Sequence, residues 1–274
     1  MRLKFSITLA LALAAMPAAE AQSFYHNGMT LFENGMYSQA RALFEQAGDP
    51  LSEAYSVLCA AKERTAGYSD LIEAYLKSNP ESILAPALHL QYGLNLFDED
   101  RYDLAAREFD LAGADTIEEE FLPEYMFKRG YCHYLAGEYA DAKSCFRKVS
   151  GMPYSQYTGP ACYYTGYILY EEKQFAQAED WFSRASEDPR FLEISSFYLV
   201  ECRFMRGDYS YVIEKGVPLM ETAPSERQSR LSRLISESYL VLGDKMKALE
   251  YYRKESAGKE NLTRRRRAAD RVPQ

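Results

Sequence analysis

The chain has 274 residues, of which 47% are hydrophobic and 26% charged, so its composition is that of a folded protein and excludes general disorder. Residues 22–263 hold 25 Lys and Arg against 38 Asp and Glu, and this net charge of −13 disfavours nucleic acid and anionic membrane surfaces as partners. Tyrosine is unusually abundant, with 23 Tyr against one Trp, and its ring suits surfaces that both pack and bind.

Residues 1–21 have the features of a secretory signal peptide. Arg2 and Lys4 supply positive charge, and residues 5–15 form an apolar run shorter than the about 20 residues that a membrane-spanning helix needs. Ala19-Glu20-Ala21 then offers a cleavage site before Gln22. We expect an exported protein, periplasmic in a Gram-negative source, with no membrane segment left after cleavage. An uncleaved anchor is the alternative.

Residues 22–258 are dominated by a repeating pattern. Four glycines are each followed nine residues later by an aromatic residue, twelve later by alanine and sixteen later by phenylalanine. These sets are Gly28, Ala40 and Phe44; Gly93, Ala105 and Phe109; Gly130, Ala142 and Phe146; and Gly166, Ala178 and Phe182. Because the alanine and the phenylalanine lie on one face of a helix, the pattern predicts pairs of antiparallel helices.

The recurring glycine indicates a packing requirement, since glycine inside a helix costs about 1 kcal/mol relative to alanine. We expect the second helix to approach the first closely here, through its alanine. Polar or glycine-containing turns such as Asn34-Gly35 and Gly137-Glu138 separate the two helices. A leucine lies three residues after three of the glycines, and His133 departs from this rule.

Three further hairpins keep the pattern only in part. They lie around Tyr55 and Tyr75, around Phe197 and Tyr209, and around Tyr239 and Tyr252. With the four clear repeats they bring the expected number of hairpins to about seven.

This pattern resembles the tetratricopeptide repeat, in which glycine, an aromatic residue or leucine, and Ala-x-x-x-Phe recur at a period near 34. The resemblance covers about residues 24–255. It implies an all-α fold, a right-handed α-solenoid of about seven antiparallel hairpins with the first helices on the concave face. It also implies a protein or peptide as the partner.

In such a solenoid, the first-helix residues three before, one after and four after the glycine position line the groove. The candidate binding residues are therefore Tyr25, Met29, Phe127, Tyr131, Tyr134, Tyr163, Tyr167 and Tyr170; the same positions give Phe32, Leu90, Leu94, Phe97, Phe197, Glu201 and Phe204. We expect a tyrosine-lined groove that holds an extended peptide or a partner helix. The alternative is that the rings pack against the neighbouring repeat, which we favour for Phe32 and Phe97.

Residues 259–274 form a basic tail with four consecutive arginines, Arg264 to Arg267, where the first helix of another repeat would begin. Two interpretations remain open. The tail is either disordered or the shortened remnant of a longer repeat array.

The sequence offers no arrangement typical of a catalytic or metal site. The three histidines lie in different repeats, and the five cysteines lack zinc-ligand spacing, so we expect no metal and cysteines placed in the core. Phosphate-loop, G-x-S-x-G and H-E-x-x-H motifs are missing, so we expect neither an enzyme nor a cofactor. The prediction is an interaction scaffold of the bacterial cell envelope. Binding of carbohydrate or peptidoglycan is the alternative, because stacked tyrosines suit sugars equally well.

Overall fold

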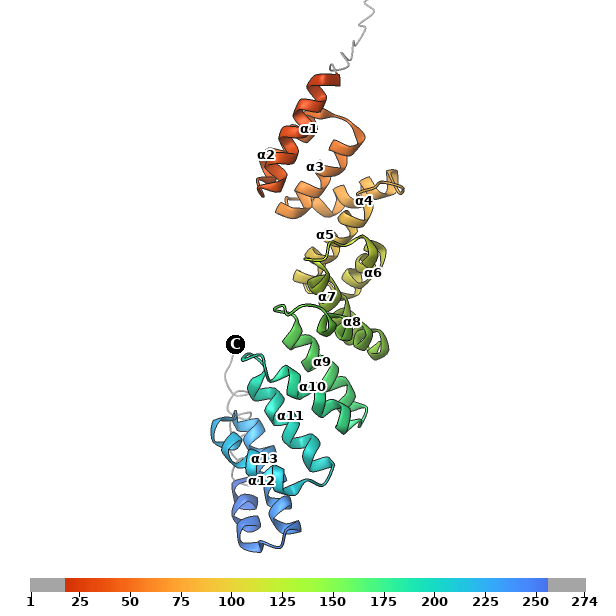
Figure 1. The fold of residues 1–274 in the computed structure, drawn as a ribbon. Coiled ribbons are helices and arrows are strands. Elements are labelled where there is room, and N and C mark those ends of the chain that lie inside the picture. The colour runs from red at the N-terminus through yellow and green to blue at the C-terminus, as the bar shows by residue number, and fades with distance from the viewer. Residues whose placement is uncertain (1–17, 256–274) are drawn as a thin grey trace, which may run out of the picture. The chain divides into compact units, whose positions relative to one another are not determined.

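The computed structural model of the chain describes residues 18–255, and every regular element within them is helical (Figure 1). The chain forms two compact units, divided between Ile117 and Glu118. Unit 1 contains α1 (Ala18–Glu33), α2 (Tyr37–Ala47), α3 (Pro50–Glu63), α4 (Tyr68–Ser78), α5 (Ala85–Asp98), α6 (Tyr102–Ala112) and the 3-10 helix η1 (Ala114–Thr116). Unit 2 contains α7 (Leu122–Leu135), α8 (Tyr139–Gly151), α9 (Thr158–Glu171), α10 (Phe175–Ala185), α11 (Leu192–Met205), α12 (Tyr209–Thr222) and α13 (Ser225–Val241), followed by helical residues 245–255.

The helices pair as the sequence predicts. Within each unit, consecutive helices pack as hairpins, and the second helix of one hairpin packs on the first helix of the next: α2 on α3, α8 on α9 and α10 on α11. With α13 and residues 245–255 as the last pair, the described residues form seven hairpins. The predicted all-α solenoid of stacked hairpins is therefore confirmed.

The recurring glycine makes room for the phenylalanine ring of the second helix. A Cβ atom built on Gly93 would lie 2.8 Å from two ring atoms of Phe109, and Gly28, Gly130 and Gly166 face their own phenylalanines in the same way. Each of these phenylalanines is fully buried. The expectation that the helices approach through the alanine was wrong, because the phenylalanine ring is the nearer neighbour of the glycine.

In the sixth hairpin the large and the small residue are exchanged between the two helices. Val200 occupies the glycine position of α11, and Gly216 lies in α12 where the phenylalanine would be. A Cβ atom on Gly216 would lie 3.3 Å from Ile235 of α13 and 3.5 Å from Val200. A small residue thus still faces a large one, which explains why this hairpin packs although its sequence pattern is degenerate.

Most hairpin turns place one residue in the left-handed backbone region, seven positions after the glycine position. Glycine fills this place at Gly35 and Gly137, whereas Asp100 and Lys173 adopt it at φ of 59° and 62°. His133, which stands where the other three clear repeats have leucine, lies beside one such turn. Its Nδ1 atom lies 2.6 Å from Oε2 of Glu138, so a polar contact to the turn replaces the packing of leucine.

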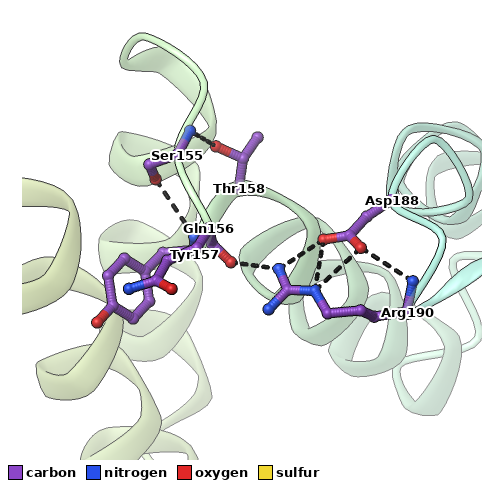
Figure 2. Close-up of polar contacts among 6 residues, drawn as sticks. All are labelled: Ser155, Gln156, Tyr157, Thr158, Asp188 and Arg190. Carbon is purple, nitrogen blue, oxygen red and sulfur yellow. Dashed lines mark hydrogen bonds and ion pairs between the residues drawn. The ribbon is translucent and has the colours of Figure 1, made fainter.

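Neighbouring hairpins of unit 2 are also joined by hydrogen bonds between residues 34 positions apart, close to the 36 residues that separate Gly130 from Gly166. Figure 2 shows one of them: Arg190 donates from Nη2 to the backbone oxygen of Gln156 at 2.5 Å. The Arg190 side chain is held in turn by Asp188, with Nε donating to Oδ1 at 3.1 Å. Arg184 donates likewise to the backbone oxygen of Ser150. The loops before α9 and α11 are therefore tied to each other as well as to their helices.

Several sequence predictions concern the ends of the chain. Ala19-Glu20-Ala21 lies in the first turns of α1, while the charged and apolar parts of the expected signal peptide and the whole basic tail lie outside the described residues. No helix within residues 18–255 is both long and apolar enough to cross a membrane. The prediction of core cysteines is confirmed, since all five are buried.

Candidate functional site

The predicted groove residues lie on the first helices of their hairpins, and all eight are half-buried. They divide between the two units. Tyr25 and Met29 lie on α1, whereas Phe127, Tyr131 and Tyr134 lie on α7 and the remaining three on α9. Half-burial means that each side chain packs against the scaffold and still presents part of its surface to solvent.

In unit 2 these residues join into one continuous set of ring contacts, which we call the tyrosine band. It consists of Phe127, Tyr131, Tyr134, Tyr163, Tyr164, Tyr167, Tyr170 and Tyr198. Tyr134 and Tyr167 link α7 to α9 with ring centroids 6.4 Å apart, and Tyr167 and Tyr198 link α9 to α11 at 5.5 Å. The band therefore runs across the first helices of three successive hairpins.

Two members of the band, Tyr164 and Tyr198, were not among the predicted residues. Each stacks on the core phenylalanine of the preceding hairpin: Tyr164 on Phe146 at 5.6 Å and 22°, and Tyr198 on Phe182 at 4.9 Å and 9°. Both lie two residues before the glycine position of their own helix. The recurrence of tyrosine at this position was visible in the sequence. The phenylalanine that it contacts lies in the preceding repeat, so a search within single repeats misses the pair.

The predicted residues of unit 1 form a separate cluster at its first two hairpins. Tyr25 lies 6.0 Å from Phe44 and 6.1 Å from Tyr55, measured between ring centroids, and Phe44 stacks on Tyr55 at 5.2 Å. Met29 and Phe32 pack against the same cluster. Phe97 of α5 instead contacts Tyr102 of its own hairpin.

The tyrosine band meets a charge pair on its α11 side, in which the carboxylate is buried and the guanidinium is exposed. Glu201, in the position that the sixth repeat was predicted to contribute, has only 3% of its surface exposed and forms an ion pair with Arg230 of α13. Tyr170 donates a hydrogen bond to Oε2 of Glu201 at 3.1 Å, and Arg230 donates from Nη2 to the Tyr170 hydroxyl at 3.0 Å. Arg230 also lies over the ring of Phe197, 5.6 Å from its centroid.

Burial shifts the pKa of several of these groups. It raises the pKa of Glu201, although Arg230 and the Tyr170 hydroxyl act in the opposite direction. It also raises the pKa of Tyr134, Tyr164 and Tyr167, and that of Tyr198 to about 12, where the neighbouring Tyr167 adds to the effect. At neutral pH the band therefore presents uncharged phenols, whose hydroxyl groups both donate and accept hydrogen bonds.

The described residues show no arrangement suited to catalysis. No group of three or more His, Cys, Asp or Glu among them could hold a metal ion. A pocket of about 480 Å³ in unit 1 is lined by Pro50, Leu51, Tyr75 and residues 78–83, and Glu81 is the only carboxylate in that lining. The tyrosine band is the arrangement that suits recognition, because aromatic area, hydroxyl groups and a fixed charge pair lie together on it.

Two comparisons with known proteins concern the fold. Residues 124–150, which span most of α7 and α8, match the family model of the tetratricopeptide repeat. The fold is similar to that of YrrB, described as a tetratricopeptide-repeat protein with an unusual peptide-binding site, at 16% identity and a TM-score of 0.56 over 73% of this chain and 97% of that one.

Two further structures share the fold. MamA from Desulfovibrio magneticus is 16% identical, with a TM-score of 0.53 over 65% of this chain and 96% of that one. The C-terminal part of a repeat protein from Cytophaga hutchinsonii is 18% identical, with a TM-score of 0.52 over 85% of this chain and 94% of that one. No protein of curated function matches the sequence. At these identities the likeness concerns the fold alone.

Proposed function

Because this chain has the fold of tetratricopeptide-repeat proteins, and one of its hairpins matches their family model, we propose that it is a non-enzymatic scaffold for protein–protein interaction. The tyrosine band of unit 2 is its binding surface for an extended peptide or a partner helix. The observation that carries this proposal is the half-burial of the predicted tyrosines, which remain partly open to solvent after the hairpins have packed.

The packing of the band favours binding rather than opposing it. Each ring already contacts rings of its own and the neighbouring helix, such as Tyr134 with Tyr164 at 5.1 Å and Tyr170 with Tyr198 at 5.2 Å. A partner therefore meets side chains whose rotamers are largely fixed, so little conformational entropy is lost when it binds. Packing and binding are two roles of the same rings, and the two interpretations of the sequence need not exclude each other.

The polar groups of the band can fix the direction in which a peptide binds. The phenol hydroxyls can pair with the backbone groups of an extended peptide, while the Glu201 and Arg230 pair marks one end of the surface with a fixed orientation of charge. YrrB, which shares this fold, is described as having a peptide-binding site, and this supports a peptide as the class of partner.

We place this activity in the cell envelope. The support is the N-terminal sequence, in which Arg2, Lys4 and the apolar residues 5–15 precede Ala19-Glu20-Ala21. Fractionation of the source cells, followed by N-terminal sequencing of the protein, tests this. A periplasmic protein that begins at Gln22 is expected, and an intact N-terminus in the cytosolic fraction would contradict export.

A peptide selection tests the proposed surface. Peptides are selected from a displayed library on the wild-type chain, and their affinity is measured for Tyr167→Ala and for Tyr154→Ala. Tyr154 is the matched control, because it is 72% exposed and lies in a loop outside the band. We expect Tyr167→Ala to weaken binding about tenfold or more, as loss of a central aromatic contact does.

The same experiment also distinguishes the proposed surface and ligand from their alternatives. Equal affinity of the two variants would refute the band as the binding surface. Tyr167→Phe retains the ring and its packing, so its affinity separates the contribution of the hydroxyl from that of the fold. Retention of the chain on insoluble cell wall, without selection of any peptide, would instead favour peptidoglycan as the ligand.

A further inference from the structure

One part of the tyrosine band brings three rings together beside a carboxylate. Tyr134 of α7 contacts Tyr139, the first residue of α8, with ring centroids 6.0 Å apart at 51°, and Tyr164 of α9 at 5.1 Å and 56°. Glu171, the last residue of α9, faces the hydroxyl of Tyr167: the pKa of this phenol is raised by burial and then by the charge of Glu171 and a hydrogen bond to it. We call Tyr134, Tyr139, Tyr164 and Glu171 the acidic corner.

The rings of the acidic corner recur one hairpin further along the chain. Tyr170 and Phe175 follow Tyr134 and Tyr139 by 36 positions, and their ring centroids lie 5.6 Å apart at 67°. Tyr170 contacts Tyr198 of the next first helix at 5.2 Å and 66°. With Glu201, these three rings form a second corner of nearly the same geometry.

The second corner holds a guanidinium group of the chain itself. Arg230 of α13 donates from Nη2 to the Tyr170 hydroxyl at 3.0 Å and forms an ion pair with Glu201. The charge of Arg230 also reaches Tyr167, but Glu201 offsets it. The structure therefore shows that rings in this arrangement, next to a carboxylate, accept a basic side chain.

The chain does not supply the same group to the acidic corner. Arg230 follows Tyr170 by 60 positions, and the residue that follows Tyr134 by 60 positions is Ile194. Ile194 is apolar and packs against the core of the sixth and seventh hairpins. The basic side chain that completes the second corner thus has no counterpart at the acidic corner.

The carboxylate of the acidic corner is also left without a cation of the chain. Among residues 18–255, no Lys or Arg forms an ion pair with Glu171. The neighbouring Glu172 differs, because Nζ of Lys143 lies 2.6 Å and 2.7 Å from its two carboxylate oxygens. Tyr139 is 47% exposed, so the corner is open to solvent.

We propose that the acidic corner binds a basic side chain, arginine or lysine, of the peptide that the tyrosine band holds. The cationic group lies against the rings of Tyr134 and Tyr139 and pairs with Glu171. Arginine is preferred to lysine, because its planar guanidinium stacks on rings and is the group that fills the second corner. Residues 118–255 carry 22 Asp and Glu against 18 Lys and Arg, which also favours a basic peptide.

This inference rests on the function proposed for the band and specifies the class of peptide that the band binds. A matched pair of peptides tests it on the full chain. Peptides selected on the wild type from a displayed library are sequenced, and the tightest is made again with its basic residue neutralised, citrulline replacing arginine or acetyl-lysine replacing lysine. We expect arginine or lysine to be enriched at one position of the aligned peptides. Neutralisation should weaken binding by at least about fivefold, and by less at about 300 mM than at about 50 mM salt.

Variants of the chain locate the contact. Glu171→Gln should weaken binding of the basic peptide by about threefold or more and leave that of the neutral peptide unchanged. Glu172→Gln is the matched control, since this carboxylate is adjacent in sequence but bound by Lys143, and it should change neither affinity. Glu171→Lys should reverse the preference, so that a peptide with glutamate in place of the basic residue binds more tightly than the basic peptide. Glu171 is exposed at the C-terminal end of α9, where loss of a negative charge does not weaken a helix, so these variants should fold.

The outcomes separate this inference from the function on which it rests. Selected peptides that depend on Tyr167 but carry no enriched arginine or lysine would overturn the inference and leave the band as a peptide-binding surface. Equal affinity of the basic and neutral peptides would do the same, as would equal effects of Glu171→Gln and Glu172→Gln. Failure to select any peptide would overturn the function proposed for the band, and the inference with it.

Discussion

Substituting Gly130 by alanine tests whether the recurring glycine is required for packing. Alanine gains about 1 kcal/mol over glycine in a helix interior, so propensity alone predicts a more stable protein. The structure predicts the opposite. The added Cβ atom would lie 2.9 Å from Cβ of Cys145 and 2.9 Å from Cε1 of Phe146. A Cβ atom moves only with its own helix, so the contact with Cys145 is not relieved by a change of rotamer.

The expected change in the free energy of unfolding follows from these two effects. Overpacking of a tight core costs about 1–3 kcal/mol, and the close contact with Cys145 favours the upper part of that range. After subtraction of the gain in propensity, we expect Gly130→Ala to lower the free energy of unfolding by about 1–2 kcal/mol. Gly151, the last residue of α8 in the same hairpin, has nothing within 4 Å of its Cβ position, so Gly151→Ala should be neutral or stabilising.

Urea unfolding of the three proteins, followed by circular dichroism, measures the difference. Hydrogen exchange of peptides from α7 and α8 localises it, because repeat arrays do not always unfold in one step. Combining Gly130→Ala with Phe146→Leu should cost less than the sum of the single changes, by about 0.5 kcal/mol or more, since the smaller side chain relieves part of the clash. If Gly130→Ala stabilises the protein as much as Gly151→Ala does, the packing argument is refuted.

Three further predictions concern unit 2. Burial raises the pKa of Glu201, so the folded state takes up a proton as the pH falls, and the stability of the wild type relative to Glu201→Gln should be greater at about pH 4.5 than at about pH 7.5 in urea titrations. An unchanged difference would contradict this direction. Burial raises the pKa of Tyr198 to about 12, so the unfolded state ionises first above about pH 10 and stability is lost there; tyrosinate absorbance and far-UV circular dichroism should change together. Ionisation of all tyrosines without unfolding would argue against a packed band. Finally, Gly159→Ala places a Cβ atom 2.6 Å from Cβ of Asp188 and should lower the thermal midpoint, whereas Gly151→Ala should not.

The helical hairpins could be predicted from the sequence because their determinants lie within single repeats. Gly166, Ala178 and Phe182 follow one another at fixed spacing, and this spacing alone indicates two packed helices. The atom that fills the space above the glycine could not be assigned in this way. The spacing places alanine and phenylalanine on the same face, and only the coordinates show that the phenylalanine ring is the closer neighbour.

The candidate site was predicted less completely because its contacts cross from one repeat to the next. Tyr164 and Tyr198 depend on phenylalanines of the preceding hairpins, and Arg230 reaches Tyr170 across 60 positions of sequence. No pattern within a single repeat contains these pairs. The reversed packing at Val200 and Gly216 was missed for the same reason, since Ile235 of the next hairpin completes it.

Photo-crosslinking in the source cells shows whether the tyrosine band binds a protein partner. A photoreactive phenylalanine analogue is placed at Tyr167 in one strain and at the exposed loop residue Tyr154 in another. We expect a covalent adduct with one defined protein from position 167 and none from position 154. Absence of any protein adduct at position 167, or the same adducts from both positions, would contradict it.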